Sequence, residues 1–567
     1  MKLRSLSLLL FVIQTGISSL HLAAQSNTQS NIQNEYFDIL FGNELKLDRM
    51  QRPMELVPRP DGGVVIHSSK GWGKDMAIDI VKSDFEQNST LVYKIDQDAP
   101  RRSNKLLYFG KKFIWVNSLK EKKTDADNLF LREINSETGE FQGDEILINK
   151  TKDVTGGGIE VGGDWGLFSD LGSGAGGMYM TLVKTERYYC SVSPDSTKLA
   201  VYYRKRPVKK LNKLNKDVWG FVVVDDQFNV LWTREVEMPQ TEFMMKFYEA
   251  EVNNDGTVFC LTQVYKDDIR KYKKGAKPNY NITILEIGQN DKKPKPKVIS
   301  MEDVFLRAIS MHITDNDQVL LTGTYVKNHK VSGASGVFYN LLDFNSRKAG
   351  ESKFIEFDPE LDASYESPKY IKQQQKSYKK NGEPHIPNLC FREVYFDPET
   401  EEITLLLEAY RMVTVISNNG RTVTYHFYYD DIYVLRIDTD KQEITRSYKI
   451  PKRQYGRNVM ADLGVSSAMY GDKLFVFFID NKKNLEIQPD MEPATHTAGA
   501  GGYLTGVLID LDKASEPQRF LMFDSRKEKL HCDPTRFVYS NGDIYGITYE
   551  KAAGGGPYRP LRLSLKD

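Results

Sequence analysis

The sequence predicts an all-β fold, because one strand–turn–strand pattern recurs about eight times along its 567 residues. Each copy has an alternating apolar strand, a short polar or glycine turn, and a second, more apolar strand. The copies lie at 56–68, 106–118, 188–203, 250–263, 311–324, 394–408, 467–479 and 537–549. A third strand follows each copy, and a polar turn and a fourth strand follow in the first seven. Each repeat is therefore predicted to be a four-stranded antiparallel meander. The aromatic content of 11%, mainly Tyr and Phe, suits such half-buried pleated surfaces.

Repeated four-stranded sheets predict a single β-propeller of about eight blades, since a ring of sheets packed face to face leaves only short, protected edges. The last copy ends after its third strand, at 561–565, and the segment 37–47 before the first copy is a spare strand. We expect strands from both termini to complete the eighth blade and close the ring. The spacing between successive turns is uneven, so seven blades with one rearranged repeat is the alternative.

Two short motifs resemble known propeller subfamilies. Ser-Pro-Asp at 193–195, followed by Lys-Leu-Ala at 198–200, resembles the strand motif of TolB-like propellers, with Ser196 where that motif has glycine. The stretch Asn-Ser-Glu-Thr-Gly-Glu at 135–140 is similar to the turn of quinoprotein-like repeats. Each motif occurs once, and the repeated signatures of WD40, sialidase and kelch propellers are missing. The resemblance therefore implies the propeller fold and no specific family.

The first 24 residues have the features of a signal peptide. Lys2 and Arg4 precede an apolar run at 5–13, and small residues at 22–24 suit cleavage. Polar residues interrupt the apolar run well before the roughly 20 residues that span a bilayer. We therefore expect an exported chain, periplasmic or extracellular, whose mature part, 25–567, forms the propeller without a transmembrane segment.

The charge balance argues against a nucleic-acid partner. Lys plus Arg and Asp plus Glu both number 77, so the net charge is zero and no global field favours a polyanion. The four cysteines, Cys190, Cys260, Cys390 and Cys532, lie on separate strand-like runs without metal-type spacing. Buried free thiols are the favoured interpretation, and a bridge between Cys190 and Cys260 is the alternative.

Four long insertions are predicted to lie on one face of the disc, because alternate connections of a meander emerge at opposite ends. They occupy 151–185, 204–216, 358–388 and 480–502. The first is rich in glycine, which permits close backbone approach to a ligand. Its candidate ligand-binding residues are Glu160, Asp164, Trp165 and Asp170. A flexible connector or a plug over the central channel is the favoured interpretation, because no phosphate-loop pattern ending in Gly-Lys-Ser or Gly-Lys-Thr is present.

The other three insertions differ in composition. The second, 204–216, holds seven basic residues, which favour a solvated loop or a contact with an acidic partner or anionic glycan. The third, 358–388, is polar and is interpreted as a disordered bulge, with a lid as the alternative. The fourth places His496 beside a glycine run, and we expect it to line the channel mouth together with 552–557. His496 is the fifth candidate ligand-binding residue, although a lone loop histidine is typically at the surface.

No catalytic, metal or cofactor motif is recognisable in the sequence. The sequence therefore predicts a non-enzymatic binding or scaffold protein of the cell envelope that holds a protein or a glycan. The alternative is a secreted carbohydrate-active enzyme with a carboxylate pair at the channel mouth, because propeller glycosidases take such carboxylates from separate blades. Asp164, Asp170, Asp430 and Asp431 are candidates for that pair.

Overall fold

A computed structural model describes residues 31–566 of the chain, apart from short internal ranges. The ranges left out of the description are 46, 48–50, 71–74, 86, 95–100, 122–123, 125, 157–158, 162–186, 209–213, 268–276, 302, 332, 344–349, 417–422, 459, 461 and 552–554. The predicted signal peptide therefore lies outside the described residues. None of the helices within them is long and apolar enough to cross a membrane.

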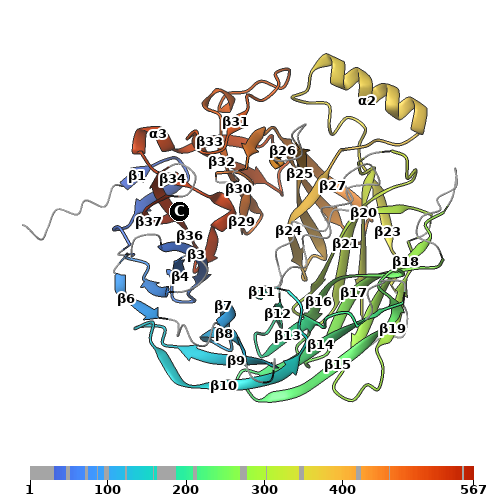
Figure 1. The fold of residues 1–567 in the computed structure, drawn as a ribbon. Coiled ribbons are helices and arrows are strands. Elements are labelled where there is room, and N and C mark those ends of the chain that lie inside the picture. Colours follow the sequence, from blue (N-terminus) through green and yellow to red (C-terminus); the bar gives the residue numbers. More distant parts are fainter. Residues whose placement is uncertain are drawn as a thin grey trace, which may run out of the picture.

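Eight antiparallel sheets stand around a central axis, as Figure 1 shows. Blade 1 contains β3 (Gln51–Pro58), β4 (Val64–Lys70), β5 (Asp75–Val81) and β6 (Gln87–Lys94). Blade 2 contains β7 (Arg101–Phe109), β8 (Lys112–Lys120), β9 (Ala126–Ile134) and β10 (Phe141–Lys152). Blade 3 contains β12 (Tyr188–Val192), β13 (Lys198–Arg204), β14 (Lys216–Asp225) and β15 (Val230–Thr241), with β11 (Ile159–Val161) added beside β12. Blade 4 contains β16 (Met245–Val252), β17 (Val258–Tyr265), β18 (Tyr280–Ile287) and β19 (Lys295–Ile299).

The second half of the ring repeats this arrangement. Blade 5 contains β20 (Phe305–Ile313), β21 (Val319–Val326), β22 (Gly336–Leu342) and β23 (Lys353–Glu356). Blade 6 contains β24 (Leu389–Asp397), β25 (Glu402–Ile416), β26 (Val423–Asp438) and β27 (Glu443–Ile450), extended by β28 (Gln454–Arg457) and β31 (His496–Thr497). Blade 7 contains β29 (Ser466–Tyr470), β30 (Lys473–Asp480), β32 (Tyr503–Asp510) and β33 (Gln518–Asp524). The helical elements among the described residues are α2 (Pro368–Asn381), α3 (Ser525–Glu528) and the short 3₁₀ turns η1 (Lys482–Asn484) and η2 (Pro534–Arg536).

Strands from both ends of the chain close the ring in blade 8. This blade contains β35 (Val538–Ser540), β34 (His531–Cys532), β36 (Asp543–Lys551) and β37 (Gly555–Leu565). The N-terminal β2 (Phe37–Phe41) pairs antiparallel with β37, with Phe37 opposite Leu565 and Phe41 opposite Leu561, and β1 (Asn31–Gln33) continues the sheet outward. Eight blades and closure by both termini are thus confirmed, and the seven-blade alternative is wrong.

The hydrophobic core is divided among the interfaces between neighbouring blades. Each of the eight interfaces has its own cluster of buried residues, including one that joins blade 8 to blade 1. Trp219 of blade 3 and Phe247 of blade 4 stack with ring centroids 4.0 Å apart, which is a typical contact across such an interface. The ring is therefore stabilised by burial between sheets, as the alternating pattern of the strands requires.

Side chains of one blade satisfy backbone amides on the innermost strand of the next. The Leu106 N–H donates to Glu55 Oε2 (3.0 Å), and the Met311 N–H donates to Glu249 Oε1 (2.8 Å). Both glutamates directly follow a bulge on their own innermost strand. Because a buried unpaired amide is costly, these carboxylates have a structural role between blades.

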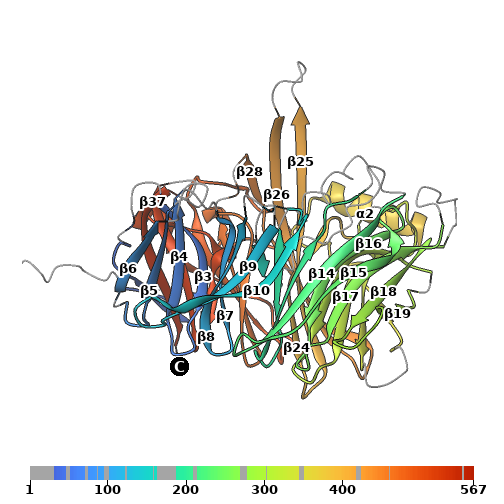
Figure 2. The same cartoon turned by 60° about the horizontal axis from the view of Figure 1, so that its bottom comes forward.

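Helix α2 of the third insertion and the longest hairpin of the ring lie on one face of the disc. Figure 2 shows α2 and the long hairpin of β25 and β26 on the same side, and the C-terminus on the other. All four cysteines are buried and free, so the favoured interpretation is confirmed and the alternative bridge between Cys190 and Cys260 is absent.

Candidate functional site

The third insertion is ordered and carries a helix, so the expected disordered bulge is wrong. Ser367 is the N-cap of α2 and accepts a hydrogen bond from the Tyr370 N–H, and Pro368 occupies the first turn. Gly382 ends the helix in the left-handed conformation, with φ of 74°. These end signals, rather than apolar periodicity, define a helix in which no residue is buried.

The fourth insertion supports the third. The Tyr365 N–H donates to the Pro489 carbonyl oxygen (2.7 Å), which joins the two insertions through their backbones. Arg453, which follows β27, forms an ion pair with Glu492 of the fourth insertion (3.0 Å). The helix is therefore attached to blades 6 and 7 rather than suspended above the ring.

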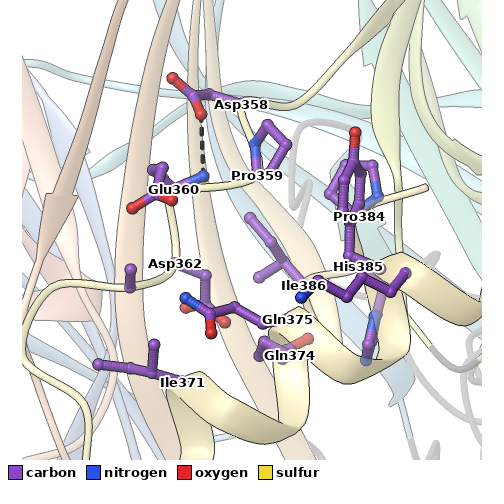
Figure 3. Close-up of a pocket in the computed structure, with 13 residues that line it drawn as sticks. Asp358, Pro359, Glu360, Asp362, Ile371, Gln374, Gln375, Pro384, His385 and Ile386 are labelled. Carbon is purple, nitrogen blue, oxygen red and sulfur yellow. Dashed lines mark hydrogen bonds between the residues drawn. The ribbon is translucent and has the colours of Figure 1, made fainter. Parts of the chain in front are cut away.

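A cavity of about 490 Å³ lies between α2 and the loop that leads into it, and Figure 3 shows its lining. Acidic and amide groups share this lining with apolar side chains. The polar members include Asp358, Glu360, Asp362, Gln374, Gln375, Lys379 and His385, and the apolar members include Pro359, Ile371, Pro384 and Ile386. Its volume and mixed lining are typical of a site for a small ligand or for one segment of a larger one.

A buried ionic cluster shares one residue, Asp362, with the lining of this cavity. The Lys449 Nζ lies 3.0 Å from Asp362 Oδ1, 3.2 Å from Glu366 Oε1 and 3.2 Å from Asp431 Oδ2. Two of the carboxylates come from the insertion and one from β26, so the cluster joins the insertion to blade 6. Tyr433 of β26 also donates a hydrogen bond to Asp362.

The same cluster has the spacing of a metal site, but its centre is occupied. Oxygen atoms of Asp362, Glu366 and Asp431 lie within 4.8 Å of one another. The Lys449 ammonium is within 3.2 Å of all three carboxylates, so it already supplies the positive charge that a cation would bring. We therefore interpret the cluster as a structural ion network.

Two carboxyl groups near this cluster have strongly raised pKa values. Burial, together with the charges of Asp431 and Asp362, raises the pKa of Glu366 to about 7, although Lys449 opposes the shift. Burial and the neighbouring Asp431 raise the pKa of Asp430 to about 6. For Lys449, burial would lower the pKa, but the three carboxylates outweigh it and raise the pKa. Shifted pKa values occur in structural ion networks as well as at functional sites, so the cavity beside this cluster is a candidate site because of its volume and lining rather than because of these shifts.

The second prominent feature of this face is a projecting hairpin, which we call the arm. It comprises residues 410–416 of β25 and 423–429 of β26, beyond the part of β25 that pairs with β24. Figure 2 shows the arm rising above the ring. At a rise of about 3.3 Å per residue, seven residues extend roughly 23 Å.

The arm exposes apolar side chains on both of its faces. Ile416, Val423 and Tyr425 are 60%, 44% and 41% exposed, and Val413 and Val415 are 39% and 47% exposed. Ile416 pairs directly with Val423, and Val415 pairs with Thr424 in the next register position, so the two groups point to opposite sides. Its base is held by aromatic contacts, including Tyr410 with Tyr429, whose ring centroids are 4.7 Å apart.

The candidate residues chosen from the sequence are only partly described. Glu160 lies on β11, which pairs in parallel with β12 on the channel side of blade 3 (Figure 1). Asp164, Trp165 and Asp170 lie outside the described residues. Their role therefore stays a prediction.

His496 is buried, 2% exposed, and not at the surface as a lone loop histidine was expected to be. Burial lowers its pKa to about 4, so the imidazole is neutral at pH 7. Its Nε2 has no hydrogen-bond partner among the described residues. The structure does not bring His496 into the cavity under α2.

Sequence reasoning named Asp431 as a candidate carboxylate but missed the rest of the lysine cluster and the arm. Asp362 and Glu366 are close together in one insertion, but Asp431 and Lys449 belong to a later part of the chain, so the four residues form no motif. The arm had a visible signal, because β25 and β26 are 15 and 16 residues long, whereas most strands of the blades have five to ten.

No protein-family model matches the chain, and no curated protein is similar enough in sequence to count as a relative. Several solved structures match most of the chain at low sequence identity and low TM-score. The β-propeller domain of Nup133 from Vanderwaltozyma polyspora is 11% identical with a TM-score of 0.35, and the match covers 95% of this chain and all of that one. The WD40 domain of SCAP from fission yeast is 9% identical with a TM-score of 0.38, covering 95% and 98%. Prolyl oligopeptidase B from Galerina marginata is 9% identical with a TM-score of 0.35, covering 88% of this chain and 55% of that one. At this level of similarity the matches carry no argument about function.

Proposed function

We propose that the chain is an exported, non-enzymatic β-propeller of the cell envelope that holds a protein or glycan partner on its insertion-bearing face. The arm is the observation that supports a protein partner most directly. Exposed apolar side chains grouped on one projection are typical of interaction sites, whereas isolated ones are ordinary surface. The arm has five of them within two short strand segments.

The free energy that a partner would gain by covering the arm follows from the exposure of its apolar side chains. Full burial of a Val or Ile side chain contributes about 1.5–3 kcal/mol, and the five side chains are roughly half exposed. Covering the three that share one face, Ile416, Val423 and Tyr425, would therefore contribute on the order of 3 kcal/mol, which corresponds to roughly a hundredfold in affinity.

The test is an affinity purification from the native envelope, with the bound fraction analysed for proteins and sugars. The arm variant carries Val415→Thr, Ile416→Thr and Val423→Thr, which keep β propensity and remove apolar area. The matched control carries the same change at Ile146, Leu147 and Val298, which are 40%, 49% and 51% exposed. A stoichiometric, identified protein partner that the arm variant loses and the control keeps supports the proposal. Absence of any stoichiometric partner overturns it.

The second candidate is a carbohydrate-active enzyme, which the raised pKa of Asp430 favours. A glycosidase needs one carboxyl that stays protonated near neutral pH as the general acid, and a pKa of about 6 suits that role. Hydrolysis across a glycan panel that Asp430→Asn abolishes would support this function. No hydrolysis by the wild-type protein would exclude it for those glycans.

A further inference from the structure

Helix α2 presents a stripe of lysines on the side away from the ring. Its fourteen residues contain five lysines and no acidic residue, although the whole chain has equal numbers of basic and acidic side chains. With 3.6 residues per turn, Lys369, Lys372, Lys376 and Lys380 fall within an arc of about 80°. All four are exposed, and none forms an ion pair with any residue that the structure describes.

The stripe lies opposite the side of the helix that contacts the protein. Tyr370 donates a hydrogen bond to Asp362 (2.7 Å), and Gln374 donates one to the Tyr370 hydroxyl (2.6 Å). Ile371 and Gln374 line the cavity. The helix is therefore fixed through one face, and the opposite face carries the lysines.

This arrangement is unfavourable for the helix by itself. Lys372 and Lys376, and Lys376 and Lys380, are like-charged neighbours at i and i+4, which destabilises a helix. Lys369 lies in the first turn, where the helix dipole disfavours a positive charge. An external polyanion would remove both penalties at once.

We propose that the outer face of α2 binds a linear anionic polysaccharide. This inference rests on the proposed function and deepens it, because it names the class of glycan and the surface that holds it. The four lysines extend over about 16 Å along the helix axis, so they contact several successive charged groups of one chain.

The shape of the face favours a linear chain over a flat anionic membrane. The arm rises well beyond α2 on the same side of the ring, as Figure 2 shows, so a flat surface touching the arm would be held away from the helix. A flexible polymer can follow the helix at the rim of the disc, where Figure 1 places it.

The experiment measures binding of the purified full-length mature protein to polygalacturonate and to heparin, which carry carboxylate and sulfate groups respectively. Neutral dextran, single-stranded DNA and phosphatidylglycerol vesicles are the comparison ligands. The test variant carries Lys→Gln at 369, 372, 376 and 380. The matched control carries Lys→Gln at Lys292, Lys293, Lys441 and Lys513, which lie on turns of the opposite face. A variant with Lys→Arg at the four α2 positions keeps the charge, and limited proteolysis of 358–388 checks that the insertion stays folded.

Four contacts to a polyanion with the charge density of a single nucleic-acid strand give a log–log salt slope of about −3, so affinity falls about 50-fold from 50 to 200 mM salt. We expect the wild-type protein to bind one of the two acidic polysaccharides with a salt slope of that order. The Lys→Gln variant should bind much more weakly and lose most of the salt slope. The Lys→Arg and control variants should keep the wild-type affinity. Equal binding by the Lys→Gln variant overturns the inference. So does binding to dextran, or tighter binding to DNA or vesicles than to either acidic polysaccharide. An arm-dependent protein partner with no polysaccharide binding would retain the proposed function and reject this inference alone.

Discussion

Replacing Glu366 with glutamine is expected to stabilise the protein at alkaline pH and to have little effect at acidic pH. Glu366 shares the Lys449 ammonium with two other carboxylates, so three acids face one lysine in a buried setting, with Arg453 the next cation. Burial is the main cause that raises the pKa of Glu366 from 4.5 to about 7, and the charges of its acidic neighbours add to the shift. The folded protein therefore holds this proton more tightly than the unfolded chain does.

The direction and size of the change in stability follow from the linkage between proton binding and folding. Between pH 4.5 and pH 7 the folded state binds more protons at Glu366, so the free energy of unfolding falls as the pH rises through this range. A change of pKa from 4.5 to about 7 corresponds to about 3 kcal/mol, and solvent screening at this half-buried carboxyl reduces it to about 1–2 kcal/mol. Because glutamine resembles the protonated acid, Glu366→Gln removes this cost only where wild-type Glu366 is ionised.

The assay is urea denaturation of wild type and Glu366→Gln at pH 5 and pH 8, with proteolysis of 358–388 as a local measurement. Glu360→Gln, an exposed carboxylate on the same insertion, is the control. We expect the variant to be about 1–2 kcal/mol more stable than wild type at pH 8 and nearly equal at pH 5. A difference that is the same at both pH values, or larger at pH 5, would refute the interpretation of the cluster.

Three further results are expected. Lys449→Met leaves three carboxylates near one another without their ammonium, so it should cost about 3–5 kcal/mol in urea denaturation at pH 8, and a loss below 1 kcal/mol would contradict the ion-network interpretation. Phe37→Ala should cost about 3–5 kcal/mol, because Phe37 is fully buried with ring centroids 5.0 and 5.7 Å from those of Phe475 and Phe477, and an unchanged unfolding midpoint would contradict closure by the N-terminal strand. All four thiols should resist an aromatic disulfide reagent in the native protein and react after unfolding, and rapid labelling of any of them without denaturant would contradict their burial.

The ring could be predicted from the sequence because its determinants are local. Alternation along each strand fixes which side chains face the next blade, and turn residues separate the strands at short intervals. The unpaired strand at 37–47 and the missing fourth strand after 561–565 could be matched because a sheet edge needs a partner. The pairing of β2 with β37 in the structure confirms this match between the two termini.

The site could not be predicted, for two different reasons. Lys449 meets Asp431 through the pairing of β26 with β27, but it meets Asp362 only through the packing of an insertion onto these strands, and no spacing in the sequence encodes that second contact. Helix α2 did have a sequence signal, since Ser367 and Pro368 open it and Gly382 ends it. The helix could not be recognised from apolar periodicity, because it contacts the protein through Tyr370 and other polar groups rather than through a hydrophobic face.

Blade 6 connects the two surfaces proposed to bind partners. Strand β26 continues without a break from the arm at Val423 to the ion cluster at Asp431, and Lys449 lies on β27, the strand that pairs with it. The other two carboxylates of the cluster belong to the insertion that carries α2. A partner on the arm and a polysaccharide on α2 would therefore be held in a fixed relative position by one strand and one buried ion network. Since Glu366 is the member of that network with a pKa near neutrality, the rigidity of this connection should decrease between pH 5 and pH 8, and Glu366→Gln should remove the difference.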